Sequence, residues 1–140
     1  KVTDVTSNNK TISTNNIIDT NRKILLVEDN ELNFEIAKTV LQEAGFKVDG
    51  ASNGKEAVDK ASDNTYDIIL MDIQMPIMDG YEATKKLRKL GNRTPIIAMT
   101  ANAFSEDRKK AKDVGMDAYI AKPIDVKTLV STIVNILNGQ

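Results

Sequence analysis

The chain contains no cysteine and no histidine among its 140 residues. Without cysteine it can form no disulfide, use no thiolate nucleophile and build none of the usual structural zinc sites. Without histidine it lacks Ser-His and Cys-His catalysis and every imidazole metal ligand. Any metal ion must therefore be bound through oxygen ligands, which suits Mg²⁺ or Ca²⁺.

Excess positive charge and long apolar runs are also lacking. The formal net charge is -1, so we expect no direct nucleic-acid binding, which needs a basic patch or stripe. No run approaches the roughly 20 apolar residues of a membrane span, and no signal-peptide segment opens the chain. We therefore expect no membrane contact by this fragment and a cytoplasmic location. Because the chain begins with Lys1 rather than Met, we expect a piece of a larger parent protein, for which a membrane anchor stays open.

Composition divides the chain into two parts. Residues 1–21 are rich in Thr, Ser and Asn and carry only isolated apolar residues. This composition is typical of a flexible linker or tail, with a short docked segment at residues 17–18 as the alternative. Residues 22–140 have a normal apolar content and are numerous enough to bury one sizeable core, so we expect a single domain there.

Short apolar runs predict the strands of that domain. Three continuous runs, residues 24–27, 68–71 and 96–99, are typical of strands buried on both faces of a parallel sheet. Residues 46–51 alternate in polarity and residues 118–121 are less apolar, so both segments are predicted to be edge strands. The fold class is therefore α/β, a doubly wound five-stranded parallel sheet of strand order 2-1-3-4-5, as in flavodoxin-like proteins.

Helices are predicted between the strands. Asn53 before Glu56 and Asp79 before Glu82 resemble capping pairs, and Asp125 is placed to cap a last helix. Gly45 is placed to end the first helix. The apolar positions at helical spacing are Leu32, Ile36, Val40, Leu41 and Ala44 in the first helix, and Val126, Leu129, Val130, Ile133, Val134 and Leu137 in the last.

The segment between Ser105 and Gly115 differs from the other predicted helices. It offers little more than Ala111 and Val114 to a core. Because few apolar contacts mean low local stability, we predict that this fourth helix is the most mobile element of the domain.

Polar side chains follow four of the predicted strands. Glu28 and Asp29 follow the first, Asp72 the third, Thr100 the fourth and Lys122 the fifth. Ligands of doubly wound sheets bind outside the carboxyl ends of the strands. We therefore expect three carboxylates, one hydroxyl and one ammonium at the same edge of the sheet.

This set of side chains predicts metal-assisted phosphoryl chemistry. Crowded carboxylates repel one another, and a divalent cation such as Mg²⁺, for which Mn²⁺ is expected to substitute, removes that repulsion. Asp29 and Asp72 are the best direct ligands, Glu28 is a ligand directly or through water, and the backbone carbonyl of Gln74 completes the set. Lys122 and Thr100 would balance the charge of a phosphoryl group, while Asp72 would be the nucleophile that forms an acyl phosphate.

Four motifs give the chain a family resemblance. Over roughly residues 22–138 it resembles the receiver domains of response regulators, and it keeps all five of the family's central positions. The matching segments are Val27-Glu28-Asp29-Asn30, Leu70-Met71-Asp72-Ile73-Gln74-Met75-Pro76-Ile77-Met78-Asp79-Gly80, Ala98-Met99-Thr100-Ala101-Asn102-Ala103 and Tyr119-Ile120-Ala121-Lys122-Pro123.

The resemblance implies a function and a switch. It implies Mg²⁺-dependent transfer of a phosphoryl group to Asp72 from the phosphohistidine of a histidine kinase or histidine phosphotransfer domain, followed by slow autodephosphorylation. It further implies that Thr100 moves toward the phosphoryl group and that Tyr119 turns inward, which remodels the face formed by the fourth helix, fifth strand and fifth helix. Gln74 and Asn102 occupy positions near the hydrolytic water.

The same resemblance extends to the backbone and to the parent protein. It implies a cis peptide bond between Lys122 and Pro123. Within the family, the chain is most similar to receivers attached to hybrid sensor histidine kinases. Whether to class it as an enzyme stays open, since it would catalyse only its own phosphorylation and dephosphorylation.

Three other functions fit the sequence less well. A flavodoxin-like FMN carrier would need a hydroxyl- and glycine-rich phosphate loop, whereas Glu28 and Asp29 would repel phosphate. An aspartyl-phosphate phosphohydrolase usually has a second Asp two residues after the first, where this chain has Gln74. A degenerate receiver that only binds partners is disfavoured by the intact Asp72, Thr100 and Lys122.

Overall fold

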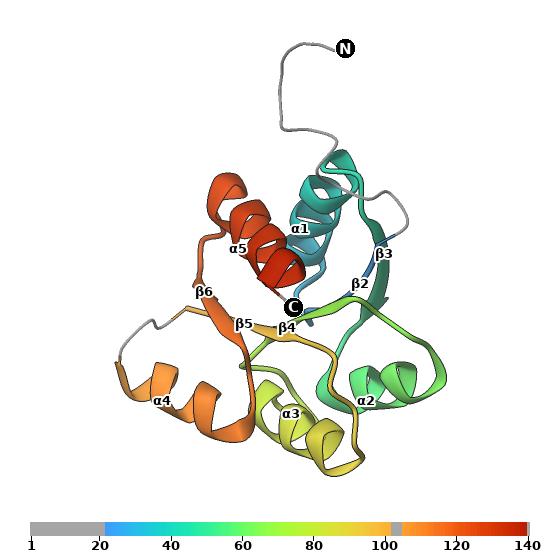
Figure 1. Cartoon of the computed structure of the whole chain (residues 1–140), viewed down its shortest axis with the longest axis vertical. Helices are drawn as coiled ribbons and strands as arrows, with labels where there is room; N and C mark the ends of the chain where they lie inside the picture. The colour runs from blue at the N-terminus through green and yellow to red at the C-terminus, as the bar shows by residue number, and fades with distance from the viewer. Residues whose placement is uncertain (1–21, 102–104, 140) are drawn as a thin grey trace.

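The computed structural model describes residues 22–101 and 105–139 of the chain. Within them, strands and helices alternate along the sequence (Figure 1). The elements are β2 (Lys23–Val27), α1 (Glu31–Glu43), β3 (Lys47–Ala51), α2 (Gly54–Asp63), β4 (Ile68–Asp72), α3 (Gly80–Lys89), β5 (Ile96–Thr100), α4 (Ser105–Val114), β6 (Ala118–Ala121) and α5 (Val126–Gly139). The predicted linker, residues 1–21, lies outside the described residues.

The five strands form one parallel sheet in the order β3-β2-β4-β5-β6. This order confirms the predicted doubly wound sheet and the two predicted edge strands, β3 and β6. All residues of the central strands β4 and β5 are buried, as expected for continuous apolar runs covered on both faces. Asp72 and Thr100 are themselves the last residues of these two strands, so the sheet positions both side chains directly.

Helices cover both faces of the sheet, with α1 and α5 on one side and α2, α3 and α4 on the other (Figure 1). The first face buries Ala37 and Leu41 of α1 and Leu129 and Ile133 of α5. The second buries residues of α2 and α3 together with Ala111 of α4. The sheet is therefore covered by a separate hydrophobic core on each face. Because the strands are parallel, their carboxyl ends meet at a common edge.

The predicted helix ends are confirmed by hydrogen bonds. The side chains of Asn53, Asp79 and Asp125 each accept a bond from the backbone N–H three residues later, at 2.9, 2.8 and 3.0 Å. Gly45 has φ of 102°, a left-handed conformation that glycine adopts at little cost after a helix end. Gly80 has another role, because a side chain there would overlap the backbone carbonyl of Asp72.

The apolar stripes of α1 and α5 differ from the prediction near the amino ends of the two helices. Leu32 is 69% exposed, Ile36 54% and Val126 53%, although all three were included in the predicted stripes. The buried ridge of α1 instead runs through Ala37 and Leu41. Leu32 and Ile36 lie on the neighbouring i, i+4 ridge, at the margin of the contact with the sheet. The result is an apolar surface next to the carboxyl edge of the sheet.

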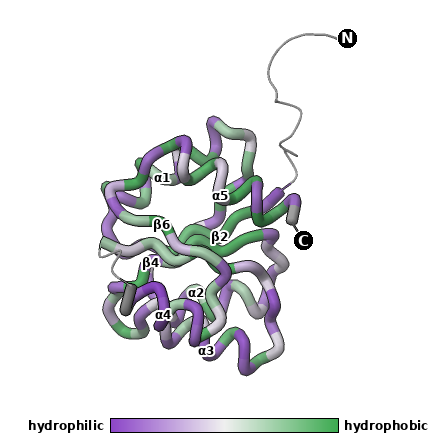
Figure 2. The backbone as a smooth tube through the Cα atoms, turned by 60° about the vertical axis from the view of Figure 1, so that its left-hand side comes forward, coloured by the Kyte–Doolittle hydropathy of each residue, from purple (hydrophilic) through white to green (hydrophobic). Residues whose placement is uncertain are grey.

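Helix α4 has few apolar contacts, as its sequence predicts. Among its described side chains Ala111 is buried and Val114 is partly buried, and its polar character is visible in Figure 2. Its mobility stays a prediction. In the described part of the chain, no helix has the length and apolar character needed to span a membrane.

Candidate functional site

Four chain segments bring polar side chains together at the carboxyl edge of the sheet. Glu28 and Asp29 directly follow β2, Asp72 ends β4, Thr100 ends β5 and Lys122 directly follows β6. Glu28, Asp72 and Thr100 are only 4 to 6% exposed, whereas Asp29 is exposed. The edge therefore combines a buried polar centre with one carboxylate open to solvent.

The three carboxylates lie close enough to share one ion. One ligand oxygen from each of Glu28, Asp29 and Asp72 lies within 4.8 Å of the others. Among the described residues, this is the group of acidic side chains with the geometry to hold a metal. All donors are carboxylate oxygens, the ligands that hard cations such as Mg²⁺ prefer.

Lys122 connects two of these carboxylates. Its ammonium nitrogen Nζ lies 3.0 Å from Oε1 of Glu28 and 3.0 Å from Oδ2 of Asp72. Backbone N–H groups bind the other oxygens, that of Asn30 at 3.1 Å from Glu28 Oε2 and that of Gln74 at 3.2 Å from Asp72 Oδ1. Each buried carboxylate is thus hydrogen-bonded on both of its oxygens, which offsets the cost of burying its charge.

The pKa values of two of these groups depart from their ordinary values. Burial raises the pKa of Glu28, and the nearby charge of Asp72 adds to the rise, although the hydrogen bonds from Asn30 and Lys122 oppose it. Burial alone would lower the pKa of Lys122, but the hydrogen bonds and charges of Asp72 and Glu28 outweigh it, so the pKa is raised. Lys122 therefore stays a cation and balances part of the acidic charge.

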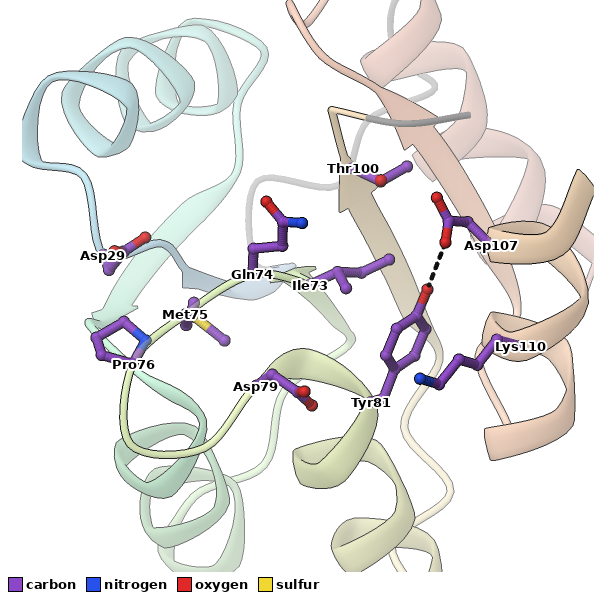
Figure 3. Close-up of a pocket in the computed structure, with 10 residues that line it drawn as sticks. All are labelled: Asp29, Ile73, Gln74, Met75, Pro76, Asp79, Tyr81, Thr100, Asp107 and Lys110. Carbon is purple, nitrogen blue, oxygen red and sulfur yellow. Dashed lines mark hydrogen bonds between the residues drawn. The ribbon is translucent and has the colours of Figure 1, made fainter. Parts of the chain in front are cut away.

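A cavity of about 540 Å³ opens beside this centre (Figure 3). Asp29 and Thr100 line it, together with the side of the β4–α3 loop and the facing side of α4. Gln74 also lines it, so this side chain lies near the carboxylates, whereas Asn102 lies outside the described residues. The complete lining is Asp29, Ile73, Gln74, Met75, Pro76, Asp79, Tyr81, Thr100, Asp107 and Lys110.

The β4–α3 loop that forms one wall of the cavity is tightly bonded. The N–H of Gly80 donates to the carbonyl of Ile73 at 2.9 Å, and the N–H of Met78 donates to the carbonyl of Pro76 at 2.7 Å. Ile77 adopts φ of 70° and is 77% exposed. Sequence reasoning missed this strained position; an isoleucine between Pro76 and Met78 gives no signal for a left-handed residue.

The expected switch residues lie on adjacent strands. In the β5–β6 pairing, Thr100 lies opposite Ala121 and Ala98 opposite Tyr119. Tyr119 is partly buried against the core below α4, and it is not among the described residues that line the cavity. The Lys122–Pro123 peptide bond is cis.

Sequence reasoning also missed the contacts that join α4 to two aromatic rings. The guanidinium of Arg108 lies 4.7 Å from the ring centroid of Tyr119, and the ammonium of Lys110 lies 4.5 Å from that of Tyr81. The Tyr81 hydroxyl also approaches Asp107 Oδ1 at 3.5 Å (Figure 3).

Comparison with known proteins identifies the family. The model of the response regulator receiver domain matches residues 24–134. The hybrid signal transduction histidine kinase I of Dictyostelium discoideum is 43% identical over 121 residues, which cover 80% of this chain and 7% of that kinase. A probable histidine kinase 1 of Oryza sativa subsp. indica is 39% identical over 140 residues, covering 76% of this chain and 14% of the kinase. The chain thus spans only a small share of these relatives.

Solved structures of receiver domains have the same fold. The receiver domain of a sensor histidine kinase from Pseudomonas aeruginosa, with a magnesium ion coordinated in its active site cleft, superposes with a TM-score of 0.77 at 40% identity, covering 86% of this chain and 99% of that one. The Saccharomyces cerevisiae complex of the histidine phosphotransfer protein Ypd1 with the receiver domain of Ssk1 gives 0.78 at 29% identity, covering 82% and 88%.

These matches, together with the fold, establish the class of the protein. The chain belongs to the response regulator receiver domain family of two-component and phosphorelay signalling. Membership of this family argues against the two alternative functions, a flavodoxin-like FMN carrier and an aspartyl-phosphate phosphohydrolase.

Proposed function

We propose that this receiver domain accepts a phosphoryl group on Asp72 in an Mg²⁺-dependent reaction. The observation that carries the proposal is the acidic cluster at the carboxyl edge of the sheet. A ligand oxygen of Asp72 there lies within 4.8 Å of one from Glu28 and one from Asp29, and Asp72 accepts a hydrogen bond from Lys122. A structural ion pair would need only one acid and one base. Three neighbouring acids repel one another, and Lys122 supplies one positive charge to them, so a bound divalent cation would relieve the remaining repulsion.

The donor set fits magnesium. Asp29 and Asp72 would be direct ligands, Glu28 a ligand directly or through water, and the backbone carbonyl of Gln74 a further one. When bound, Mg²⁺ would shield the anionic nucleophile from an anionic phosphoryl donor and neutralise charge that develops during transfer. The magnesium in the active site cleft of the Pseudomonas aeruginosa relative supports this assignment. Mn²⁺ should substitute, because it accepts the same oxygen ligands.

Asp72, Lys122 and Thr100 would have different roles in the transfer. An oxygen of Asp72 forms a bond to phosphorus while the bond between phosphorus and the histidine nitrogen of the partner breaks. Lys122, already 3.0 Å from Asp72 Oδ2, balances the negative charge of the phosphoryl oxygens. The Thr100 hydroxyl, at the end of the adjacent strand, would donate to one of those oxygens.

An apolar groove beside the cluster fits a partner that carries the phosphohistidine. The groove has a volume of about 440 Å³ and lies between α1 and the start of α5. Both Glu28 and Lys122 form part of its wall, so an occupant would lie next to Asp72. We propose that a helix of a histidine kinase or histidine phosphotransfer domain docks there, which the Ypd1–Ssk1 complex supports. Its apolar lining is Ile36, Ala37, Val40, Pro123, Ile124 and Val126.

Phosphorylation would then change the face formed by α4, β6 and α5. Thr100 would move toward the phosphoryl group and Tyr119 would turn inward into the space beside it. The backbone bond from Lys122 N–H to the Thr100 carbonyl, 2.7 Å long, couples the two strand ends. The few apolar contacts of α4 would let this helix shift at small cost. We further propose that Gln74 and Asn102 tune hydrolysis and that residues 1–21 link the domain to a hybrid kinase.

Mass spectrometry of the intact protein tests the central proposal. Incubation with acetyl phosphate or phosphoramidate and Mg²⁺ should add one phosphoryl group that hydroxylamine removes, as it does for acyl phosphates. Asp72→Asn should abolish the gain. Asp59→Asn, which changes an exposed carboxylate paired with Lys55 on α2, should leave it intact. Continued labelling of the Asp72→Asn protein, or labelling without a divalent cation, would refute the assignment.

A further inference from the structure

Two different kinds of contact hold the described part of helix α4 against the rest of the domain. At its carboxyl end, the guanidinium of Arg88 donates to the Gly115 carbonyl from both Nε, at 3.0 Å, and Nη2, at 2.8 Å. The same Nη2 lies 3.0 Å from Asp117 Oδ2. Hydrogen bonds from a charged donor to a backbone carbonyl are directional and strong, so this end is firmly attached to α3.

The remainder of α4 is attached through side chains that can separate from their partners. Arg108 lies over the ring of Tyr119 and Lys110 over the ring of Tyr81. Arg108 and Lys110 are exposed, and among the described side chains of α4 it is Ala111 that is buried in the core. A cation over an aromatic ring gives a weak attraction that depends on the ring remaining beneath the cation.

Of these two rings, that of Tyr119 is the one expected to turn toward Thr100, because Tyr119 pairs with Ala98, two residues before Thr100 along β5. The cavity beside Thr100 is lined by Tyr81, Asp107 and Lys110 but not by Tyr119 among the described residues. The ring of Tyr119 instead packs against the core on one side and faces Arg108 on the other. If the ring turned toward Thr100, it would leave the guanidinium and lose the cation–π contact.

We propose that Arg108 is a positioning residue that holds Tyr119 in its resting conformation and so sets how readily the domain switches. This proposal rests on the proposed function, in which Tyr119 turns inward on phosphorylation. The cation–π contact stabilises the resting state alone, so its removal shifts the equilibrium toward the switched state. A single contact of this kind at a partly exposed site changes a two-state equilibrium by about two- to fivefold.

Beryllofluoride, a stable mimic of the phosphoryl group, gives the test. Its apparent dissociation constant is measured by titration at saturating Mg²⁺, and the backbone amide signals of Ala118–Ala121 are recorded by NMR with and without it. Arg108→Met, which keeps side-chain length and removes the charge, should bind beryllofluoride about two- to fivefold more tightly. Its resting amide signals should also move along the line toward the positions of the bound wild type.

Three further variants separate the contact from a general charge effect. Arg108→Lys retains a cation and should fall between the wild type and Arg108→Met. Lys109→Met removes the same charge from the neighbouring exposed position and should match the wild type. In a Tyr119→Leu background, Arg108→Met should have no further effect, because the ring is gone.

The outcomes are distinct. Wild-type affinity and resting signals in Arg108→Met would overturn the proposal, as would an equal change in Lys109→Met or a full effect of Arg108→Met in the Tyr119→Leu background. Failure of the wild type to bind beryllofluoride with Mg²⁺ would instead overturn the proposed function, and this inference with it.

Discussion

Replacing Lys122 by methionine should separate metal binding from phosphoryl acceptance. The ammonium group of Lys122 and a divalent cation are attracted by the same carboxylates, those of Glu28 and Asp72. In phosphoryl transfer, however, the two positive charges act together. Lys122→Met should therefore bind Mg²⁺ more tightly than the wild type and accept a phosphoryl group more slowly.

The magnitude follows from the two 3.0 Å distances between Lys122 Nζ and the carboxylate oxygens. At this separation a unit charge pair is worth about 1.4 kcal/mol even at the dielectric constant of water, and more in a partly buried site. The Lys122 side chain is 21% exposed, so screening is incomplete. Mg²⁺ competes with the ammonium for these oxygens, so removing the ammonium tightens Mg²⁺ binding by about tenfold where one contact is displaced and by about a hundredfold where both are.

Isothermal titration calorimetry with MgCl₂ measures the affinity, and intact-mass kinetics with phosphoramidate measure the transfer rate, which should fall at least about a hundredfold. Lys127→Met, which removes a charge from an exposed position on α5, should change neither quantity by more than about twofold. Circular dichroism checks that Lys122→Met is folded. Unchanged or weaker Mg²⁺ binding by the folded variant would refute the assignment of the ion to these carboxylates.

Three further predictions concern stability, each measured by urea unfolding. Arg88→Met removes the side chain that bonds the Gly115 carbonyl and other acceptors and should cost about 3 kcal/mol; a loss below about 1 kcal/mol would contradict its role as the anchor of α4. Ile77→Gly relieves the left-handed backbone at φ of 70° without loss of packing and should gain about 1 kcal/mol, whereas Ile77→Ala, which keeps a Cβ, should gain much less. In the wild type the Tyr66 hydroxyl donates to Asp49 Oδ2 at 2.5 Å, and this hydrogen bond lowers the pKa of Asp49 below its unfolded value. Tyr66→Phe removes that hydroxyl. The stability that this hydrogen bond contributes is present above the unfolded pKa of Asp49 and is lost as pH falls through the folded pKa. Tyr66→Phe should therefore cost about 1 kcal/mol at neutral pH, and this cost should shrink below about pH 4. A cost that is independent of pH would contradict the role of this hydrogen bond.

Much of the fold could be predicted because it depends on local patterns. Continuous apolar runs predicted the central strands, because a strand that is covered on both faces of the sheet has apolar residues at consecutive positions. Asn53 and Asp79 predicted helix starts because a cap bonds an N–H only three residues away. Asp72 and Thr100 could likewise be assigned to the carboxyl edge, because a parallel sheet gathers the ends of its strands there.

Other features depended on contacts between distant segments. The burial of Ala37 rather than Leu32 and Ile36 was decided by the angle at which α1 packs on the sheet, which periodicity leaves open. The interaction of Arg108 with Tyr119 could not be predicted either, because a basic residue on a polar helix usually faces solvent.

The sequence by itself determined which residue types stand at the strand ends, and hence that acids, a hydroxyl and an ammonium would meet at one edge of the sheet. Only the tertiary structure decided which of them touch. Lys122 bonds Glu28 across 94 positions of sequence and Asp72 across 50. Contacts over such separations require the assembled sheet, because strand order and helix packing, rather than local pattern, bring the side chains within 3.0 Å.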